Sequence, residues 1–242
     1  MTSLKRIIKK DIPSIHLNKL NDSGIYVEFN EENLFEAKAL IKGPKDSLYE
    51  GGFLFFNITF PKNYPFSPPD LSYVGHNIRI HPNIYVSGHQ NGFGKVCLSI
   101  LGTWSGPKWT TIMDISSVLL TIQSLLDNNP LYHEPGFNHK NNKLLNNNYN
   151  EIIFYETIHS LCIKNILYTP DDFICFKNII TDSFNENYNL ILNKLKNQII
   201  KNKKPFKILL PYYRIHLLID YNILYNRFIN LQSNLQSNFE KN

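Results

Sequence analysis

The sequence predicts an α/β protein of the α+β type, in which a short N-terminal helix precedes a four-stranded antiparallel meander and further helices. Three observations lead to this prediction: helical spacing of apolar residues at the N-terminus, four β-rich runs before residue 75, and a long apolar stripe after residue 110. The chain has 242 residues, of which 43% are hydrophobic and 19% are charged. This suits one globular domain with a smaller attached unit.

The first segment repeats its apolar residues with the period of a helix. The apolar positions are Leu4, Ile7, Ile8, Ile12 and Ile15. The basic residues on the other side are Lys5, Arg6, Lys9 and Lys10. Thr2 or Ser3 is placed to cap the helix. We expect Pro13 to end it early, because proline lacks a backbone donor and disfavours helical geometry in the residue before it.

After residue 24 the pattern changes to β-rich runs separated by Gly, Pro, Asn and Asp, which is typical of an antiparallel meander. The four runs are 25–29, 34–41, 53–60 and 71–74. Residues 42–46 have turn chemistry, and Gly51 and Gly52 give a permissive backbone before the third run. The prolines of residues 61–69 exclude a central strand, so this block is an ordered turn or loop.

Residues 75–109 show little periodicity and are rich in Gly, Pro, His and Trp, which indicates a long irregular segment of the kind that carries function. A helix is predicted next, with Thr111 and Asp114 as a capping pair and an end before Pro130. Its apolar stripe comprises Ile112, Ile115, Val118, Leu119, Ile122, Leu125 and Leu126.

An Asn-rich stretch at 138–150 follows this helix, and we predict a division into residues 1–155 and a helical C-terminal extension of residues 156–242. The extension ends in an apolar seam with alternating four- and three-residue spacing. The seam comprises Leu217, Tyr221, Leu224, Phe228, Leu231 and Leu235. It packs either onto the first unit, which we favour, or against a helix of a partner protein.

Composition and charge exclude several classes of protein. The chain has no run of about 18 apolar residues and no signal-peptide core, so neither secretion nor membrane insertion is expected. The net charge of +5 is too weak a field to indicate nucleic-acid binding. Cys97, Cys162 and Cys175 lie far apart without a metal-ligand spacing, so we expect no disulfide framework, no metal and a reducing compartment, the cytoplasm or nucleus.

Cys97 allows two interpretations from its surroundings alone. Between Val96 and Leu98 a cysteine is ordinarily a small buried hydrophobe. The glycine-containing loop signals on both sides instead place the thiol beside exposed backbone. An exposed thiol near Asn83, His81 or His133 is able to act as a nucleophile.

Four motifs, in order along the chain, give the sequence a specific resemblance. They are YEGGFLFFNITFP at 49–61, PKNYPFSPP at 61–69, HPN at 81–83 and GKVCLSIL at 94–101. In these motifs the sequence resembles the ubiquitin-conjugating enzymes, with their UBC fold. The segments CLSILGTWSGPKW at 97–109 and NPLYHEPG at 129–136 are most similar to the large subclass that includes the enzyme for ubiquitin and the modifier FAT10. The resemblance covers roughly residues 3–155.

This resemblance implies a reaction. Cys97 would accept the C-terminal carboxyl of ubiquitin or a ubiquitin-like modifier as a thioester from an activating enzyme, then pass it to a substrate lysine, usually with a ligase. Exchange of one thioester for another is nearly balanced in free energy, so no cofactor is expected. This agrees with the absence of a phosphate-binding loop or metal-ligand motif in the sequence.

The resemblance also assigns roles to residues near Cys97. Asn83 would stabilise the oxyanion or hold the loop that does, although an asparagine in a Pro-Asn turn can be purely structural. His81 and Pro82 of the same motif are expected to be structural. Glu134 and the adjacent His133 occupy the place of an aspartate that orients or deprotonates the lysine, and the alternative for both is an inert exposed loop residue.

Two surfaces carry over in the same way. The N-terminal residues Lys5, Arg6, Lys9 and Lys10 match the helix that meets the activating enzyme. The residues that match a ligase-contacting surface are Phe66, Trp109, Thr111 and Ile112. The alternatives are a solvated helix face for the basic residues and core packing for Phe66 and Trp109.

Three departures from the family pattern stand out. Asn83 and Cys97 are further apart than in compact relatives, with an insertion at 85–94 that we expect to loop out. Ser99 replaces a common aspartate, and Thr111 replaces a common proline. Two rival functions remain: a non-catalytic relative of the same fold, which the presence of Cys97 opposes, and a thiol redox protein, which needs a resolving cysteine that the sequence does not place near Cys97.

Overall fold

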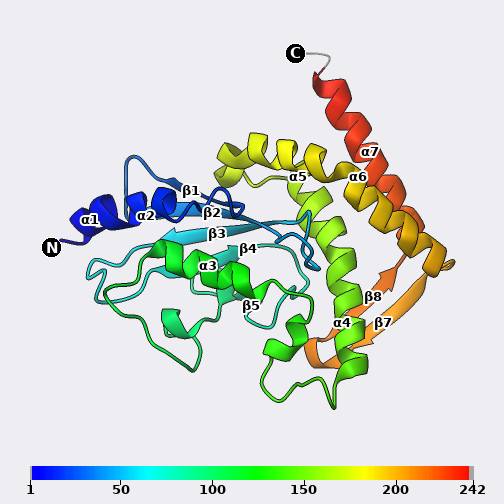
Figure 1. Ribbon diagram of the computed structural model, residues 1–242, viewed down its shortest axis with the longest axis horizontal. Coiled ribbons are helices and arrows are strands. Elements are labelled where there is room, and N and C mark those ends of the chain that lie inside the picture. The colour runs from blue at the N-terminus through cyan, green and yellow to red at the C-terminus, as the bar shows by residue number, and fades with distance from the viewer. Residues whose placement is uncertain (1, 240–242) are drawn as a thin grey trace.

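The computed structural model describes residues 2–239 and is built around a six-stranded antiparallel sheet (Figure 1). The strand order is β1-β2-β3-β4-β6-β5. The strands are β1 (Ile25–Phe29), β2 (Glu36–Lys42), β3 (Phe53–Thr59), β4 (Asp70–Val74), β5 (Ile84–Gly88) and β6 (Gly94–Val96). The predicted four-stranded meander is confirmed as β1 to β4, and β6 and β5 extend it at the β4 edge.

The segment expected to be irregular, residues 75–109, therefore contains two of the strands. The insertion at 85–94 forms most of the β5–β6 hairpin, in which Ile84 pairs with Val96 and Gly88 with Gly94 across an irregular register. The short 3-10 helix η2 (Ser99–Leu101) follows. Periodicity did not reveal these strands because β6 is three residues long and the outer part of β5 is exposed.

The N-terminal helix is longer than predicted. It runs through α1 (Ser3–Arg6), the π-helical segment η1 (Ile7–Asp11) and α2 (Ile12–Leu17) without a break. Thr2 caps it by accepting a hydrogen bond from the Lys5 N–H. Pro13 lies in the first turn of α2, directly after the π-helical segment, where an absent N–H is tolerated. The prediction that Pro13 ends the helix is wrong for this reason.

Asp11 anchors this helix to the rest of the domain. Its side chain is fully buried, and Oδ1 accepts hydrogen bonds from the Tyr64 hydroxyl at 2.5 Å and the Ile115 N–H at 3.0 Å. The Arg6 Nε lies 3.6 Å from Oδ2. Burial raises the pKa of Asp11. One carboxylate thus connects the helix with the proline-rich loop and with the start of α3.

Helix α3 (Ile115–Leu125) lies against one face of the sheet (Figure 1). Ile115, Val118, Leu119 and Ile122 of the predicted stripe are fully buried, whereas Ile112 lies before the helix and is exposed, so its place in the stripe is wrong. Asp114 alone is the N-cap and accepts from the Ser117 N–H at 3.0 Å, so Thr111 lies outside the helix and the predicted capping pair is wrong. The 3-10 helix η3 (Pro130–His133) follows.

The rest of the chain is not entirely helical. Its elements are α4 (Lys143–Glu156), η4 (Thr157–Lys164), α5 (Asn165–Leu167), η5 (Asp171–Phe176), α6 (Lys177–Lys201), β7 (Phe206–Leu210), η6 (Pro211–Tyr213), β8 (Ile215–Ile219) and α7 (Tyr221–Phe239). The predicted helical extension is confirmed, and it also contains the β7–β8 hairpin, which the sequence did not reveal. The predicted boundary at residue 155 falls inside a continuous helical run, because α4, η4 and α5 follow one another without interruption.

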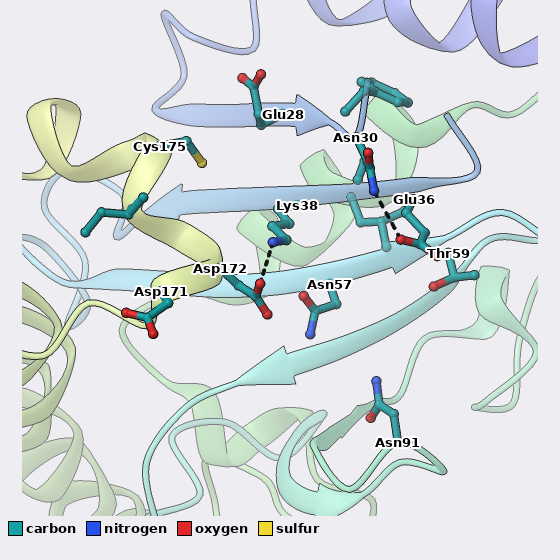
Figure 2. A pocket seen from close by; sticks show the side chains of 14 residues that line it. Glu28, Asn30, Glu36, Lys38, Asn57, Thr59, Asn91, Asp171, Asp172 and Cys175 are labelled. Carbon is teal, nitrogen blue, oxygen red and sulfur yellow. Dashed lines mark hydrogen bonds and ion pairs between the residues drawn. The ribbon is translucent and has the colours of Figure 1, made fainter. Parts of the chain in front are cut away.

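The extension covers part of the outer face of the sheet, opposite α3. Leu40 and Phe55 on this face are fully buried, and the ring of Phe173 in η5 lies 4.8 Å from that of Phe55. Gly51 allows α6 to approach closely, because a side chain there would clash with Ile191. Figure 2 shows the groove that remains beside η5, where Asp172 pairs with Lys38 at 3.0 Å.

The apolar seam of α7 packs inside the chain. Tyr221, Leu224, Phe228 and Leu231 are at most 2% exposed, whereas Leu217 belongs to β8. Phe228 stacks on Tyr188 of α6 with ring centroids 5.2 Å apart and meets Phe184 edge-on at 5.3 Å. The favoured interpretation, packing within the chain, is confirmed for these residues. Across residues 2–239, no helix combines the length and apolarity that crossing a membrane requires.

We expect Phe228→Ala to lower the free energy of unfolding by about 3–5 kcal/mol, because it leaves a cavity between α6 and α7. Urea unfolding followed by circular dichroism measures this loss. Ile223→Ala on the same helix, where the side chain is 49% exposed, is the matched control and should cost less than about 1 kcal/mol. Equal effects of the two variants would contradict the described packing of α7.

Candidate active site

Asn83 and Cys97 hold each other through two hydrogen bonds. The Cys97 N–H donates to the Asn83 carbonyl at 2.8 Å, and the Asn83 Nδ2 donates to the Cys97 carbonyl at 2.8 Å. Asn83 and Cys97 are 14 positions apart, and residues 84–96 between them form the β5–β6 hairpin, whose ends meet where Ile84 pairs with Val96. The insertion therefore loops out as a hairpin and leaves the two residues adjacent.

His81 and Pro82 support Asn83 from the preceding turn. The His81 Nδ1 accepts a hydrogen bond from the Asn83 N–H at 3.0 Å, and His81 is fully buried. Burial, together with the nearby His133 and Arg79, lowers the pKa of His81 to about 3, so its imidazole is neutral. The Pro82 carbonyl accepts from Arg79 Nη2. This geometry is that of a packed and hydrogen-bonded turn.

The thiol of Cys97 is buried, which corrects the expectation that it stands beside exposed backbone. Cys97 is 3% exposed, and its neighbours Val96 and Leu98 are also buried. Burial raises the pKa of the Cys97 thiol, and the charge of Glu134 acts in the same direction. The charges of Lys95 and Arg79 and a hydrogen bond with Tyr85 oppose this shift.

His133 lies beside the motif but is already engaged. Its Nε2 is 2.9 Å from Asp127 Oδ2, and its ring is 5.1 Å from that of His81. Hydrogen bonds from His133 and from the Asn129 N–H hold the pKa of Asp127 below its usual range, although burial opposes them. The sequence did not indicate Asp127, because nothing local distinguishes it from other loop carboxylates.

Glu134 is joined to a residue of the C-terminal extension. The Tyr213 hydroxyl donates to Glu134 Oε2 at 2.6 Å, and Arg79 Nη2 lies 3.7 Å from the same oxygen. The Glu134 side chain is 10% exposed, so it is not the exposed loop acid of the alternative interpretation. The guanidinium of Arg79 lies over the ring of Tyr85, 3.7 Å from its centroid, and over the ring of Tyr213, 4.6 Å from its centroid.

Glu134, Arg79, Tyr85 and Tyr213 form one cluster of side chains beside the HPN motif. The sequence analysis did not predict Arg79, Tyr85 or Tyr213 as site residues. A signal for Tyr85 existed, since it lies in the insertion next to the HPN motif. Tyr213 is 79 positions from Glu134, and no local pattern connects two such distant residues.

The four basic residues of the N-terminal helix do not share one exposed face. Lys5 and Lys9 are exposed. Arg6 is 8% exposed and donates to the Met113 carbonyl at 2.6 Å, and Lys10 donates to the Ile112 carbonyl. Arg6 is therefore not available on the predicted binding face, because its guanidinium contacts Asp11 and the Met113 carbonyl.

The predicted ligase-contacting residues divide between surface and support. Phe66 is 77% exposed and Ile112 is 76% exposed, so core packing is wrong for Phe66. Thr111 is also exposed. Trp109 is partly buried, and its Nε1 donates to the Pro65 carbonyl at 2.7 Å. Trp109 thus connects the loop of residues 104–113 with the loop that presents Phe66.

The other cysteines do not join this cluster. Cys162 is fully buried in η4, and burial raises its pKa. Cys175 is exposed at the groove of Figure 2, which contains none of the predicted site residues. All three cysteines are free thiols. Within residues 2–239 no group of three or more His, Cys, Asp or Glu side chains is arranged to hold a metal ion.

The three thiols should react with iodoacetamide in a fixed order at pH 8. We expect Cys175 to be alkylated first, because it is exposed. Cys97 should follow more slowly, because its thiol is buried, and Cys162 should react only on unfolding. Burial raises the pKa of all three thiols, so accessibility sets this order. Peptide mass spectrometry over a time course measures the three rates. Alkylation of Cys97 as fast as that of Cys175 would contradict the described burial.

Comparison with known proteins agrees with these motifs. The family model of the ubiquitin-conjugating enzyme matches residues 7–160. Ubiquitin-conjugating enzyme E2 Z of Danio rerio is 45% identical over 154 residues, which are 62% of this chain and 44% of the relative. The E2 Z of Xenopus tropicalis is 41% identical over 187 residues, or 75% of this chain and 56% of the relative.

A plant relative, the probable ubiquitin-conjugating enzyme E2 25 of Arabidopsis thaliana, is 38% identical over 137 residues, which are 54% of this chain and 20% of the relative. The chain thus spans about half or less of the length of these relatives. The family model covers more than half of the chain, and the strands and helices occur in the order that the resemblance predicts. The chain belongs to the ubiquitin-conjugating enzyme family.

Proposed function

We propose that this chain accepts ubiquitin or a ubiquitin-like modifier as a thioester on Cys97 and transfers it to lysine side chains. The observation that carries the proposal is the pair of hydrogen bonds between Asn83 and Cys97, which survives the long insertion between them. A cysteine that only filled the core would not need this support from the HPN motif. The pair keeps the backbone beside the thiol in one conformation.

The first step is an exchange of thioesters. The Cys97 thiolate attacks the carbonyl carbon of the modifier's thioester on the activating enzyme, a new C–S bond forms, and the activating enzyme's thiolate leaves. Because only the thiolate is nucleophilic and burial raises the pKa of Cys97, Lys95 and Arg79 matter as the positive charges that oppose this shift.

The second step is aminolysis. A neutral lysine amine attacks the thioester carbonyl, and the resulting oxyanion collapses with loss of the Cys97 thiolate; one amine proton passes to solvent or to the leaving sulfur. One hydrogen of Asn83 Nδ2 is committed to the Cys97 carbonyl, so Asn83 acts first by holding the loop. Its second hydrogen is available to an oxyanion that forms beside it.

His133 and Glu134, the two residues that could orient or deprotonate the lysine, have different roles in this proposal. His133 is engaged by Asp127 and packs on His81, so it shapes the loop. Glu134 is the carboxylate whose charge reaches Cys97, and it is the group that orients the lysine. Its charge acts on the pKa of the Cys97 thiol, and its ion-pair partner Arg79 also donates to Pro82 of the HPN motif, which is the reason for preferring it over His133.

The exposed side chains indicate which surfaces meet the activating enzyme and the ligase. Lys5 and Lys9 are the basic residues left free to meet an activating enzyme. Phe66 and Ile112 form the exposed apolar contact for a ligase, and Trp109 fixes the loops that carry them. Protein substrates would approach Cys97 from the Glu134 side. We place this activity in the cytoplasm or nucleus, where free thiols persist.

One observation favours a second candidate, a non-catalytic modifier-binding protein of the same fold. Cys97 is 3% exposed, which is little for a nucleophile that must meet a large thioester. This candidate predicts binding of the modifier without a covalent bond. The experiment below separates the two functions.

Incubation with ubiquitin, ATP and a panel of activating enzymes should shift the chain by one ubiquitin on a non-reducing gel. Added thiol should remove the band, Cys97→Ala should abolish it, and Cys97→Ser should give an oxygen ester that resists thiol. A folded chain that no activating enzyme loads with ubiquitin or a ubiquitin-like modifier would contradict the proposal and favour the non-catalytic candidate.

We expect Asn83→Ala to slow discharge of the loaded thioester to free lysine by about 100-fold, since it removes the amide that holds the Cys97 loop and faces the oxyanion. Single-turnover discharge measures the rate. Asn150→Ala is the matched control, because Asn150 Nδ2 also donates to a backbone carbonyl, that of Asn128 at 2.8 Å, in a different contact. If the two variants discharge at the same rate, Asn83 has no catalytic role.

A further inference from the structure

The C-terminal extension contributes a residue to the cluster beside Cys97. The β7–β8 hairpin lies along α4, and the 3-10 turn η6 at its tip carries Tyr213 to Glu134 and Arg79 (Figure 1). Glu134 belongs to the loop after η3, and Arg79 precedes the HPN motif. Three segments far apart in sequence therefore meet at one carboxylate.

Each group in this contact is held in place. The Arg79 carbonyl accepts from the Tyr149 hydroxyl of α4 at 2.8 Å, and its guanidinium donates to the Pro82 carbonyl. The ring of Tyr213 lies 5.3 Å from that of Tyr149. Burial and the bond to Glu134 raise the pKa of Tyr213, so its hydroxyl remains a proton donor near neutral pH. The Glu134 carboxylate is fixed by one donor and one cation.

The hairpin has docking contacts besides Tyr213. Ile208, Leu210, Ile215 and Ile219 of the hairpin are all buried. Beside it, the Tyr221 hydroxyl at the start of α7 donates to Glu151 of α4 at 2.7 Å. These contacts already dock the hairpin and α7, so the bond from Tyr213 to Glu134 calls for a different explanation.

Resting on the proposed function, we propose that Tyr213 is a positioning residue for lysine transfer: its hydroxyl holds the Glu134 carboxylate beside Cys97 so that the carboxylate accepts a hydrogen bond from the incoming lysine. In this arrangement the amine lone pair points at the thioester carbonyl. The extension is then a part of the catalytic site. Tyr213 acts through Glu134 and touches no reacting atom.

The test is a set of single-turnover discharge reactions with the full chain loaded with ubiquitin. The variants are Tyr213→Phe, Glu134→Gln and the double variant, and the acceptors are free lysine and 2-mercaptoethanol. Discharge to 2-mercaptoethanol involves no amine, so it does not depend on how Glu134 orients one. A slower rate with this thiol therefore indicates general damage to the site. Tyr221→Phe is the matched control, because it removes the same kind of tyrosine–glutamate bond elsewhere in the chain.

We expect Tyr213→Phe to slow discharge to lysine about tenfold, the effect of one charge-assisted hydrogen bond, and to slow loading and thiol discharge less than twofold. Glu134→Gln should slow lysine discharge by at least as much, and the double variant should be no slower than Glu134→Gln alone, because the two residues act as a unit. Tyr221→Phe should change all rates less than twofold. Melting temperatures of all variants verify folding.

Three results would overturn the inference alone: lysine discharge of Tyr213→Phe equal to that of Tyr221→Phe, equal loss towards lysine and thiol, or effects of Tyr213→Phe and Glu134→Gln that multiply. The last would show that Tyr213 does not act through Glu134. Failure of the unmutated chain to load a modifier would instead overturn the proposed function, and this inference with it.

Discussion

The Arg79 guanidinium is the charge around which the candidate site is arranged. Its side chain is 18% exposed, and a charge so far removed from water must be paired and hydrogen-bonded. Four segments contact the guanidinium: Pro82 of the HPN motif, Tyr85 of the inserted hairpin, Glu134 of the loop after η3, and Tyr213 of the extension. The same charge opposes the raised pKa of Cys97, so the pairing of Arg79 and the state of the thiol are coupled.

This arrangement makes the extension a structural part of the domain that the family model matches. A continuous helical run from Lys143 to Leu167 crosses the end of that match at residue 160. Phe173 then covers the outer face of the sheet, α7 packs on α6, and the hairpin returns to the cluster beside Cys97. The aligned region of the Xenopus relative covers 75% of the chain, more than residues 1–160 provide, so similarity continues into the extension.

The sequence predicted what is encoded locally: the meander, the stripe of α3, the motif around Asn83 and the buried seam of α7. It could not predict contacts between distant residues, and these decide the burial of Cys97, the engagement of Arg6 by Asp11 and the bond from Tyr213 to Glu134. Short or irregular elements were also missed, since β6 is three residues long and the π-helical segments have no sequence period of their own. The prediction that Pro13 ends the helix was wrong, because the free-energy cost of its absent N–H depends on the hydrogen-bonding pattern of the turn before it.

Hydrogen–deuterium exchange of the unmutated chain and of Tyr213→Ala shows whether the extension and the Cys97 cluster form one site. If they form one site, exchange in the variant is faster at residues 206–219 and also at 79–85 and 130–137, because loss of the ring and hydroxyl releases Arg79 and Glu134 together. Faster exchange confined to residues 206–219 would contradict a single site. The hairpin would then be docked beside the site without supporting it.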